Sequence, residues 1–296
     1  MKLTHSKAVL LMIAVTLMWS IAGVVTRHLE QAKSFEVTFW RSFFTMLSLL
    51  VILPLWQGKH VFRNMHWRSL SFWVSGVCWS VMFTAFMLGL TLTSVGNVLV
   101  MLASGPFFTA LFARVFIGHR LALRTWVAIA VAGAGIATMF GTQMNMNVPG
   151  ALLGCLVAIM APIAGGINWT VVQHAQARGD KLDLVPCVLV GAVISSLATL
   201  PLAMPFVATG QDIALLGLLG LVQLAIPCLL AVVCAQVLKA PEVSLLALLE
   251  VIFGIALAWV GANEVPSQSV IWGGTLVIGA LLFNEILGWR DKRNAS

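Results

Sequence analysis

The chain has 296 residues, of which 60% are hydrophobic and only 9% carry a charge, whereas roughly 25% of the residues of an average soluble domain are charged. This composition excludes an ordinary soluble enzyme, because a soluble globule needs a charged surface over its core. The formal net charge is +7 and the number of cysteines is odd, at five, which fits neither a disulfide framework nor a zinc site.

Long apolar stretches follow one another along the whole chain, each close to the about 20 residues that a helix needs to cross a bilayer. The first stretch follows Lys2 and Lys7, as a signal peptide would, but it continues through Val24 without a clear cleavage site. We therefore interpret it as a retained helix. Stretches of this length also exclude an outer-membrane barrel, whose strands have about ten residues of alternating polarity. The sequence predicts ten spanning helices, near residues 8–26, 36–56, 70–90, 94–117, 122–140, 149–172, 184–207, 213–237, 243–262 and 268–288.

The basic residues alternate with the predicted membrane faces and do not form one patch. If the N-terminus lies inside, the outer loops contain only Arg27 and Lys33, and Arg41 and Arg114 lie within spans. This distribution obeys the positive-inside rule, so it predicts cytoplasmic termini in the inner (plasma) membrane and makes nucleic acid an improbable partner. The cytoplasmic basic residues are Lys2, Lys7, Lys59, Arg63, Arg68, Arg120, Arg124, Arg178, Lys181, Lys239, Arg290, Lys292 and Arg293.

Weak self-similarity relates the two halves of the chain. Leu53-Pro54-Leu55 matches Leu200-Pro201-Leu202, and Trp126 and Gly133 match Trp272 and Gly279. The matches predict two five-helix repeats, residues 1–145 and 146–296. An odd number of spans in each half makes the repeats inverted and places a substrate near the midplane where they meet. Chance matches between two apolar segments are the alternative.

Two sets of motifs give a family resemblance. Thr93-Ser94-Val95-Gly96-Asn97, Ser104–Leu111 and Phe116–Leu121 resemble the fourth-helix signature of the EamA branch of the drug/metabolite transporter superfamily. Leu248–Phe253, followed by Asn263-Glu264 and Pro266, resembles its ninth-helix counterpart. The resemblance implies a ten-helix secondary transporter that exports metabolites or amino acids.

The chain departs from the family pattern at two positions. The usual Gly-Glu after the fourth helix is Gly118-His119, and the usual Glu-Pro of the ninth helix is Glu250-Val251. We expect the missing proline to remove a kink.

Two charged residues inside spans are candidate site residues, because a charge in a bilayer is costly. Glu250 lies near the middle of the ninth predicted helix, where burial disfavours the charged form of a carboxyl group. We expect it to carry a coupling proton or to pair with a cationic substrate group; a structural pairing with Arg41 or Arg114 is the alternative. Arg41 in the second helix has the geometry to hold a substrate carboxylate through two hydrogen bonds, with snorkelling or a structural ion pair as the alternative.

Uncharged polar and aromatic residues at similar depth complete the predicted site. Asn97, Met101 and Ser104 fall on one helical stripe, and an interhelical hydrogen bond is the alternative role for each polar residue. Together with the two charged residues, they predict an aromatic, amide-lined pocket for an amphipathic organic solute. The remaining members of this pocket are Trp19, Trp79, Asn168, Trp169 and Gln223.

Prolines inside spans remove one backbone hydrogen bond each and permit bending, and Pro106 and Pro227 are the predicted hinges. The sequence has no phosphate-binding GxxxxGK[ST] loop and no GxSG motif, so it predicts neither an ATP-driven pump nor an intramembrane enzyme. No catalytic residue, metal site or cofactor is predicted.

These observations predict a secondary active transporter that moves small organic metabolites by alternating access. Amino acids or related amphipathic compounds are the expected substrates, protons are a candidate coupling ion, and the protein is expected to be a monomer or a homodimer. The alternatives are uptake, efflux of cationic toxic compounds, a lipid-carrier flippase, and a membrane scaffold that transports nothing.

Overall fold

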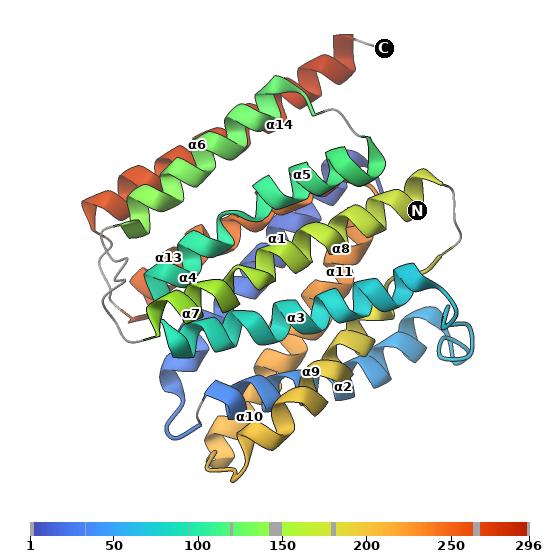
Figure 1. The fold of residues 1–296 in the computed structure, drawn as a ribbon, viewed down its shortest axis with the longest axis vertical. Helices are drawn as coiled ribbons and strands as arrows, with labels where there is room; N and C mark the ends of the chain where they lie inside the picture. Colours follow the sequence, from blue (N-terminus) through green and yellow to red (C-terminus); the bar gives the residue numbers. More distant parts are fainter. Residues whose placement is uncertain are drawn as a thin grey trace.

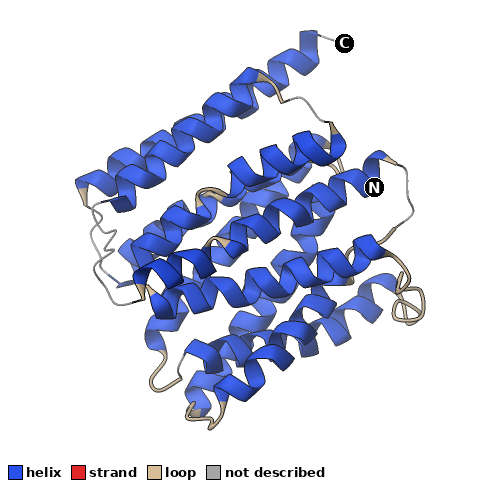
Figure 2. Cartoon of the chain, viewed as in Figure 1, coloured by secondary structure: helices blue, strands red, loops and turns tan. Residues whose placement is uncertain are grey.

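The computed structural model of the protein describes residues 3–32, 34–93, 95–118, 121–141, 150–178, 182–262 and 267–294. Several residues that carry the family resemblance lie outside the described residues, namely Ser94, His119, Arg120 and 263–266. The described part of the chain is helical and contains no strand (Figure 2).

The helices follow the predicted spans closely. The first half contains α1 (His5–Val25), the short η1 (Thr26–His28), α2 (Ser34–Gln57), α3 (Leu70–Leu92), α4 (Val95–Leu102), α5 (Gly105–Ile117) and α6 (Leu123–Phe140). The second half contains α7 (Ala151–Ala158), α8 (Met160–Ala177), α9 (Cys187–Ala203), α10 (Gly210–Leu218), the π-helical segment η3 (Leu219–Ala225), α11 (Ile226–Ala235), α12 (Ala240–Ala247), α13 (Leu249–Ala262) and α14 (Gln268–Asn294).

Nine of the described segments are long and apolar enough to cross a membrane, and α9 adds a shorter apolar helix of 17 residues. The predicted seventh span, 184–207, was too long at its end. The helix stops at Ala203, and Met204 is extended at φ −85° and ψ 144°, because the ring of Pro205 disfavours helical geometry in the residue before it.

Four of the spans are interrupted, which the hydropathy pattern does not reveal. Breaks separate α4 from α5, α7 from α8 and α12 from α13, and η3 widens the helix between α10 and α11. The ninth span has no proline after Glu250, yet it is interrupted two residues earlier. The chain breaks at Leu248 without a proline, because the amide of Leu248 bonds to Leu245 O and that of Val251 to Leu248 O, three residues back in each case, which tightens the turn.

The helices lie in layers of roughly parallel rods, as Figure 1 shows. α6 and α14 pack together at one edge of the molecule, and α2, α9 and α10 form the opposite edge. Between them, α3 packs on α8 and α9, and α1 packs on α11, α12, α13 and η3. Helices from the two halves of the chain therefore alternate through the interior.

The α6–α14 pair meets through two glycines. A Cβ atom on Gly273 would lie 2.3 Å from Gly135 O, and one on Gly135 would lie 2.7 Å from Gly273 O. Only glycine allows the two backbones to approach this closely. The last predicted spans of the two halves are thus partners of each other.

Candidate functional site

Arg41 lies about two turns into α2 and is 3% exposed. Its Nη1 donates to the Sδ atom of Met87 on α3 at 3.4 Å, and its Nε has no hydrogen-bond partner among the described residues. No acidic side chain in the described part of the chain lies within 4.0 Å of the guanidinium. A thioether is a weak acceptor, so the five N–H donors of this side chain are poorly satisfied.

Glu250 is the acidic residue that interacts electrostatically with Arg41. It lies in the first turn of α13, directly after the break at Leu248, and is half-buried. The positive end of a helix dipole favours a carboxylate there. Cys228 on α11 interacts electrostatically with both Arg41 and Glu250, and it contacts the side chain of Trp19 on α1. The structure therefore brings the two predicted charged residues, which are far apart in sequence, into one neighbourhood.

A second group joins α3 to α8. The indole rings of Trp79 and Trp169 meet edge to face, with centroids 5.6 Å apart and planes at 88°. Asn168 is fully buried, and its Oδ1 accepts a hydrogen bond of 2.7 Å from Ser75 Oγ. Trp79 Nε1 and Asn168 Nδ2 have no partner in the described part of the chain. Trp19, Trp79 and Trp169 belong to one apolar cluster of buried residues.

Gln223 lies in η3, next to the turn of α2 that carries Arg41. η3 approaches α2 through Gly220, where a Cβ atom would lie 2.9 Å from Arg41 O. Thr45 Oγ1 also donates to Gly220 O at 3.1 Å. Gln223 is buried, and its Oε1 accepts no hydrogen bond from the described residues. A π-helical turn inside an α-helix is frequent at functional sites.

The predicted stripe of Asn97, Met101 and Ser104 is not continuous. Asn97 and Met101 are on α4, which packs on α6 and α7, and Ser104 precedes α5 after the break. Asn97 Nδ2 donates to Thr93 Oγ1 at 2.6 Å, and Ser104 Oγ donates to Met101 O. Both hydrogen bonds are local, between residues four and three positions apart. The break before α5 interrupts the helical repeat on which the predicted stripe depended.

The two predicted hinge prolines lie directly after helix irregularities. Pro106 is in the first turn of α5, and Pro227 is in the first turn of α11, after η3. The first turn of a helix tolerates proline, because its N–H groups have no intrahelical acceptor.

Sequence reasoning missed a buried hydroxyl cluster between α2, α3 and α9. Ser195 Oγ lies 2.9 Å from both Ser42 Oγ and Thr84 Oγ1, and Ser196 Oγ lacks a partner among the described residues. Single hydroxyl groups within apolar spans are common, so only the packing of these helices identifies the cluster.

Two hollows lie at the end of α2 and not at the predicted pocket. They have volumes of about 380 and 430 Å³. Gln57 and Asp183 line both, and Gln57 Nε2 donates to Asp183 Oδ2 at 2.7 Å between them. Neither hollow is lined by a residue of the predicted pocket.

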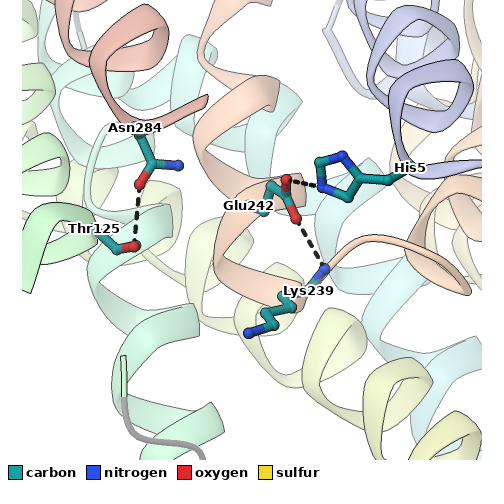
Figure 3. A network of polar contacts seen from close by, with 5 residues as sticks. All are labelled: His5, Thr125, Lys239, Glu242 and Asn284. Carbon is teal, nitrogen blue, oxygen red and sulfur yellow. Dashed lines mark hydrogen bonds and ion pairs between the residues drawn. The ribbon is translucent and has the colours of Figure 1, made fainter. Parts of the chain in front are cut away.

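Polar contacts also join α1 to α12 and α6 to α14, as Figure 3 shows. His5 hydrogen-bonds to Glu242, which also accepts from the backbone N–H of Lys239, and Thr125 Oγ1 donates to Asn284 Oδ1 at 3.1 Å. The ligand atoms of His5, Glu242 and Glu285 lie within 4.8 Å of one another. The direct His5–Glu242 contact occupies the space between two of these groups, so we interpret the cluster as a contact between helices.

The apolar spans, the interleaved halves and the buried polar groups define a multi-pass membrane protein. Residues 6–141 and 152–285 each match the EamA-like transporter family. The chain belongs to this family, which confirms that it is a transporter and not an enzyme.

Curated relatives agree with this assignment, and a solved structure has the same fold. Proteins named S-adenosylmethionine uptake transporter from Rickettsia felis and Rickettsia conorii are 26% and 25% identical to this chain. In both cases the match covers 89% of this chain and 87% of the relative. A protein crystal structure with 17% identity aligns over 96% of this chain and 99% of its own, with a TM-score of 0.79. This last likeness shows the fold alone.

Proposed function

We propose that the protein is a secondary carrier of small organic metabolites, with S-adenosylmethionine as the first candidate substrate. The observation that carries the proposal is the electrostatic interaction between buried Arg41 and half-buried Glu250, in a group that includes Cys228 and Trp19. The names of the Rickettsia relatives supply the candidate substrate.

The chemistry of S-adenosylmethionine suits this group of residues. Its adenine ring can stack on indole rings, and its positively charged sulfonium can interact with an aromatic face or with a carboxylate such as Glu250. The unpartnered polar atoms of Trp79, Asn168 and Gln223 can bond to a polar substrate edge, which removes the cost of burying them unpaired. An amphipathic organic solute uses all three kinds of contact, whereas a bare ion does not.

We further propose that ten helices cross the inner membrane as two inverted five-helix repeats, residues 1–145 and 146–296, with both termini in the cytoplasm. The two separate matches to one family support the duplication, and the distribution of basic residues supports the orientation. The break before Pro106 and the π-helical segment η3 before Pro227 supply positions at which the spans can bend during alternating access.

Uptake by proteoliposomes tests the function. Purified protein is reconstituted, and entry of labelled S-adenosylmethionine is measured with and without an inward proton gradient. We expect wild type and the exposed control Glu30→Gln to take up substrate with stimulation by the gradient, and Glu250→Gln to lose that stimulation. Uptake no faster than into empty liposomes would rule out this substrate.

The same vesicles separate the rival functions. Counterflow against labelled amino acids indicates the amino-acid carrier that the family resemblance implies, and counterflow against quaternary amines indicates a carrier of cationic toxic compounds. Direction follows from the coupling. An inward proton gradient that speeds entry of substrate indicates uptake by symport, whereas one that speeds loss of preloaded substrate indicates export by antiport. The names of the relatives favour uptake as the first direction to measure.

A further inference from the structure

The burial of Arg41 is unusual because no acidic side chain among the described residues forms an ion pair with it within 4.0 Å. The side chain is 3% exposed, its one recorded side-chain acceptor is the Met87 thioether, and Nε bonds to none of the described residues. A guanidinium is charged at any physiological pH and is expensive to bury without an anion. Its position therefore needs a compensating group.

Glu250 compensates for Arg41 only at a distance. The two side chains attract each other electrostatically, but they form no ion pair within 4.0 Å, although the structure describes both. They also come from helices in different halves of the chain, α2 and α13. A positive and a negative group held near each other but apart present two charges to a molecule that lies between them.

We infer that Arg41 and Glu250 together form a subsite for a zwitterion, in which Arg41 binds a substrate carboxylate and Glu250 faces a positively charged substrate group. This inference rests on the proposed function and specifies its substrate class as compounds that carry an amino-acid head. The guanidinium offers two parallel N–H donors to a carboxylate, a fork that lysine lacks. The carboxylate also supplies the acceptors that Met87 does not.

The subsite predicts which compounds are rejected. A compound without the carboxylate leaves Arg41 buried and unpaired, which is strongly unfavourable. S-adenosylmethionine has the required carboxylate and two positive groups, its ammonium and its sulfonium. Removal of the carboxylate leaves only positive charge, and removal of the S-methyl group leaves the carboxylate but an uncharged sulfur.

Binding of matched ligand pairs to the purified full-length protein tests the inference. The pairs are S-adenosylmethionine with its decarboxylated analogue, and methionine with 3-methylthiopropylamine. In each pair that binds, we expect the affinity of wild type for the ligand with the carboxylate to be about 100-fold higher than for the ligand without it. Arg41→Gln should reduce that ratio to within about threefold, and Arg41→Lys should restore only part of it, because the charge remains but the fork is lost. The exposed Arg114→Gln control should keep the wild-type ratio.

Glu250→Gln provides the reciprocal measurement. It should lower the preference for methionine over 4-(methylthio)butanoate, which keeps the carboxylate but lacks the ammonium group, and leave the carboxylate preference intact. A loss of both preferences in either single variant would indicate a damaged fold. Far-ultraviolet circular dichroism and the thermal midpoint check for such damage. If the fold is damaged, the carboxylate preference of Arg41→Lys decides whether the subsite exists.

The outcomes distinguish the two proposals. If S-adenosylmethionine binds as well as its decarboxylated analogue, the substrate assignment stands and the zwitterion subsite is overturned. If S-adenosylmethionine does not bind but methionine is preferred over its amine in an Arg41-dependent way, the subsite stands and the substrate assignment fails. If no carboxylate ligand binds more tightly than its amine, the subsite is wrong whatever the substrate.

Discussion

Glu36 and Asp212 each accept hydrogen bonds from the backbone of the loop that precedes the other residue's helix. Glu36, in the first turn of α2, accepts hydrogen bonds from the backbone N–H groups of Val207 and Ala208, just before α10. Asp212, in the first turn of α10, accepts from the backbone N–H groups of Glu30, Gln31 and Ala32, just before α2. Both carboxylates are buried, at 2% and 0% exposed. The pair therefore clamps together the loops that precede α2 and α10.

The Asp212→Asn variant should be markedly less stable than wild type. An amide has one acceptor oxygen in place of two, and the hydrogen bonds lose their charge assistance. We expect the free energy of unfolding to fall by about 2 to 4 kcal/mol, measured as a lower thermal midpoint in detergent. The Glu30→Gln variant is the control, because only the backbone of this exposed residue meets Asp212. Equal midpoints for Asp212→Asn and wild type would refute the clamp.

Glu36→Gln and Asp212→Asn should not have additive effects. Both carboxylates fasten the same pair of loops, so the second substitution acts on a connection that the first has already loosened. We expect the double variant to lose less stability than the sum of the single variants, with a coupling energy of about 0.5 to 3 kcal/mol. Strict additivity in the thermal midpoints of the four proteins would show that the two clamps act independently.

A methyl group at the α6–α14 contact should weaken it. The Cβ of Gly273→Ala would lie 2.3 Å from Gly135 O, a backbone atom, so the helices must move apart. We expect a loss of about 1 to 3 kcal/mol from overpacking. Gly279→Ala on the same helix is the control, because nothing lies within 4 Å of its Cβ position. If the two variants have the same thermal midpoint, the glycine contact does not hold the pair together.

Single cysteines should report the proposed orientation. The five native cysteines are buried and should react slowly, so exposed positions can be labelled in the wild-type background. A membrane-impermeant maleimide should label Lys59→Cys only from the cytoplasmic side and Gln211→Cys only from the outside. Labelling of both from the same side would contradict the arrangement of α2 and α10, and exchanged sides would invert the proposed topology.

The sequence alone was sufficient for the class of the protein and the positions of its spans. Apolar runs, the distribution of lysine and arginine, and family motifs are properties of short segments, and α2 and α14 begin within two residues of their predicted starts. It also identified Glu250 and Arg41 as candidates, because a charged residue within an apolar span can be recognised from the sequence alone.

Only the tertiary structure decided which of these residues meet. It brings Arg41 near Glu250, interrupts the span between Met101 and Pro106, and reveals the clamp of Glu36 and Asp212. Hydropathy is summed along one segment, so it carries no information about which face of a helix packs on which neighbour. Hydropathy also does not predict the break at Leu248, because the residues on both sides of the break are apolar and the break consists in a local change of hydrogen bonding. Contacts between residues about 200 positions apart depend on how the helices pack, and that packing determines the site.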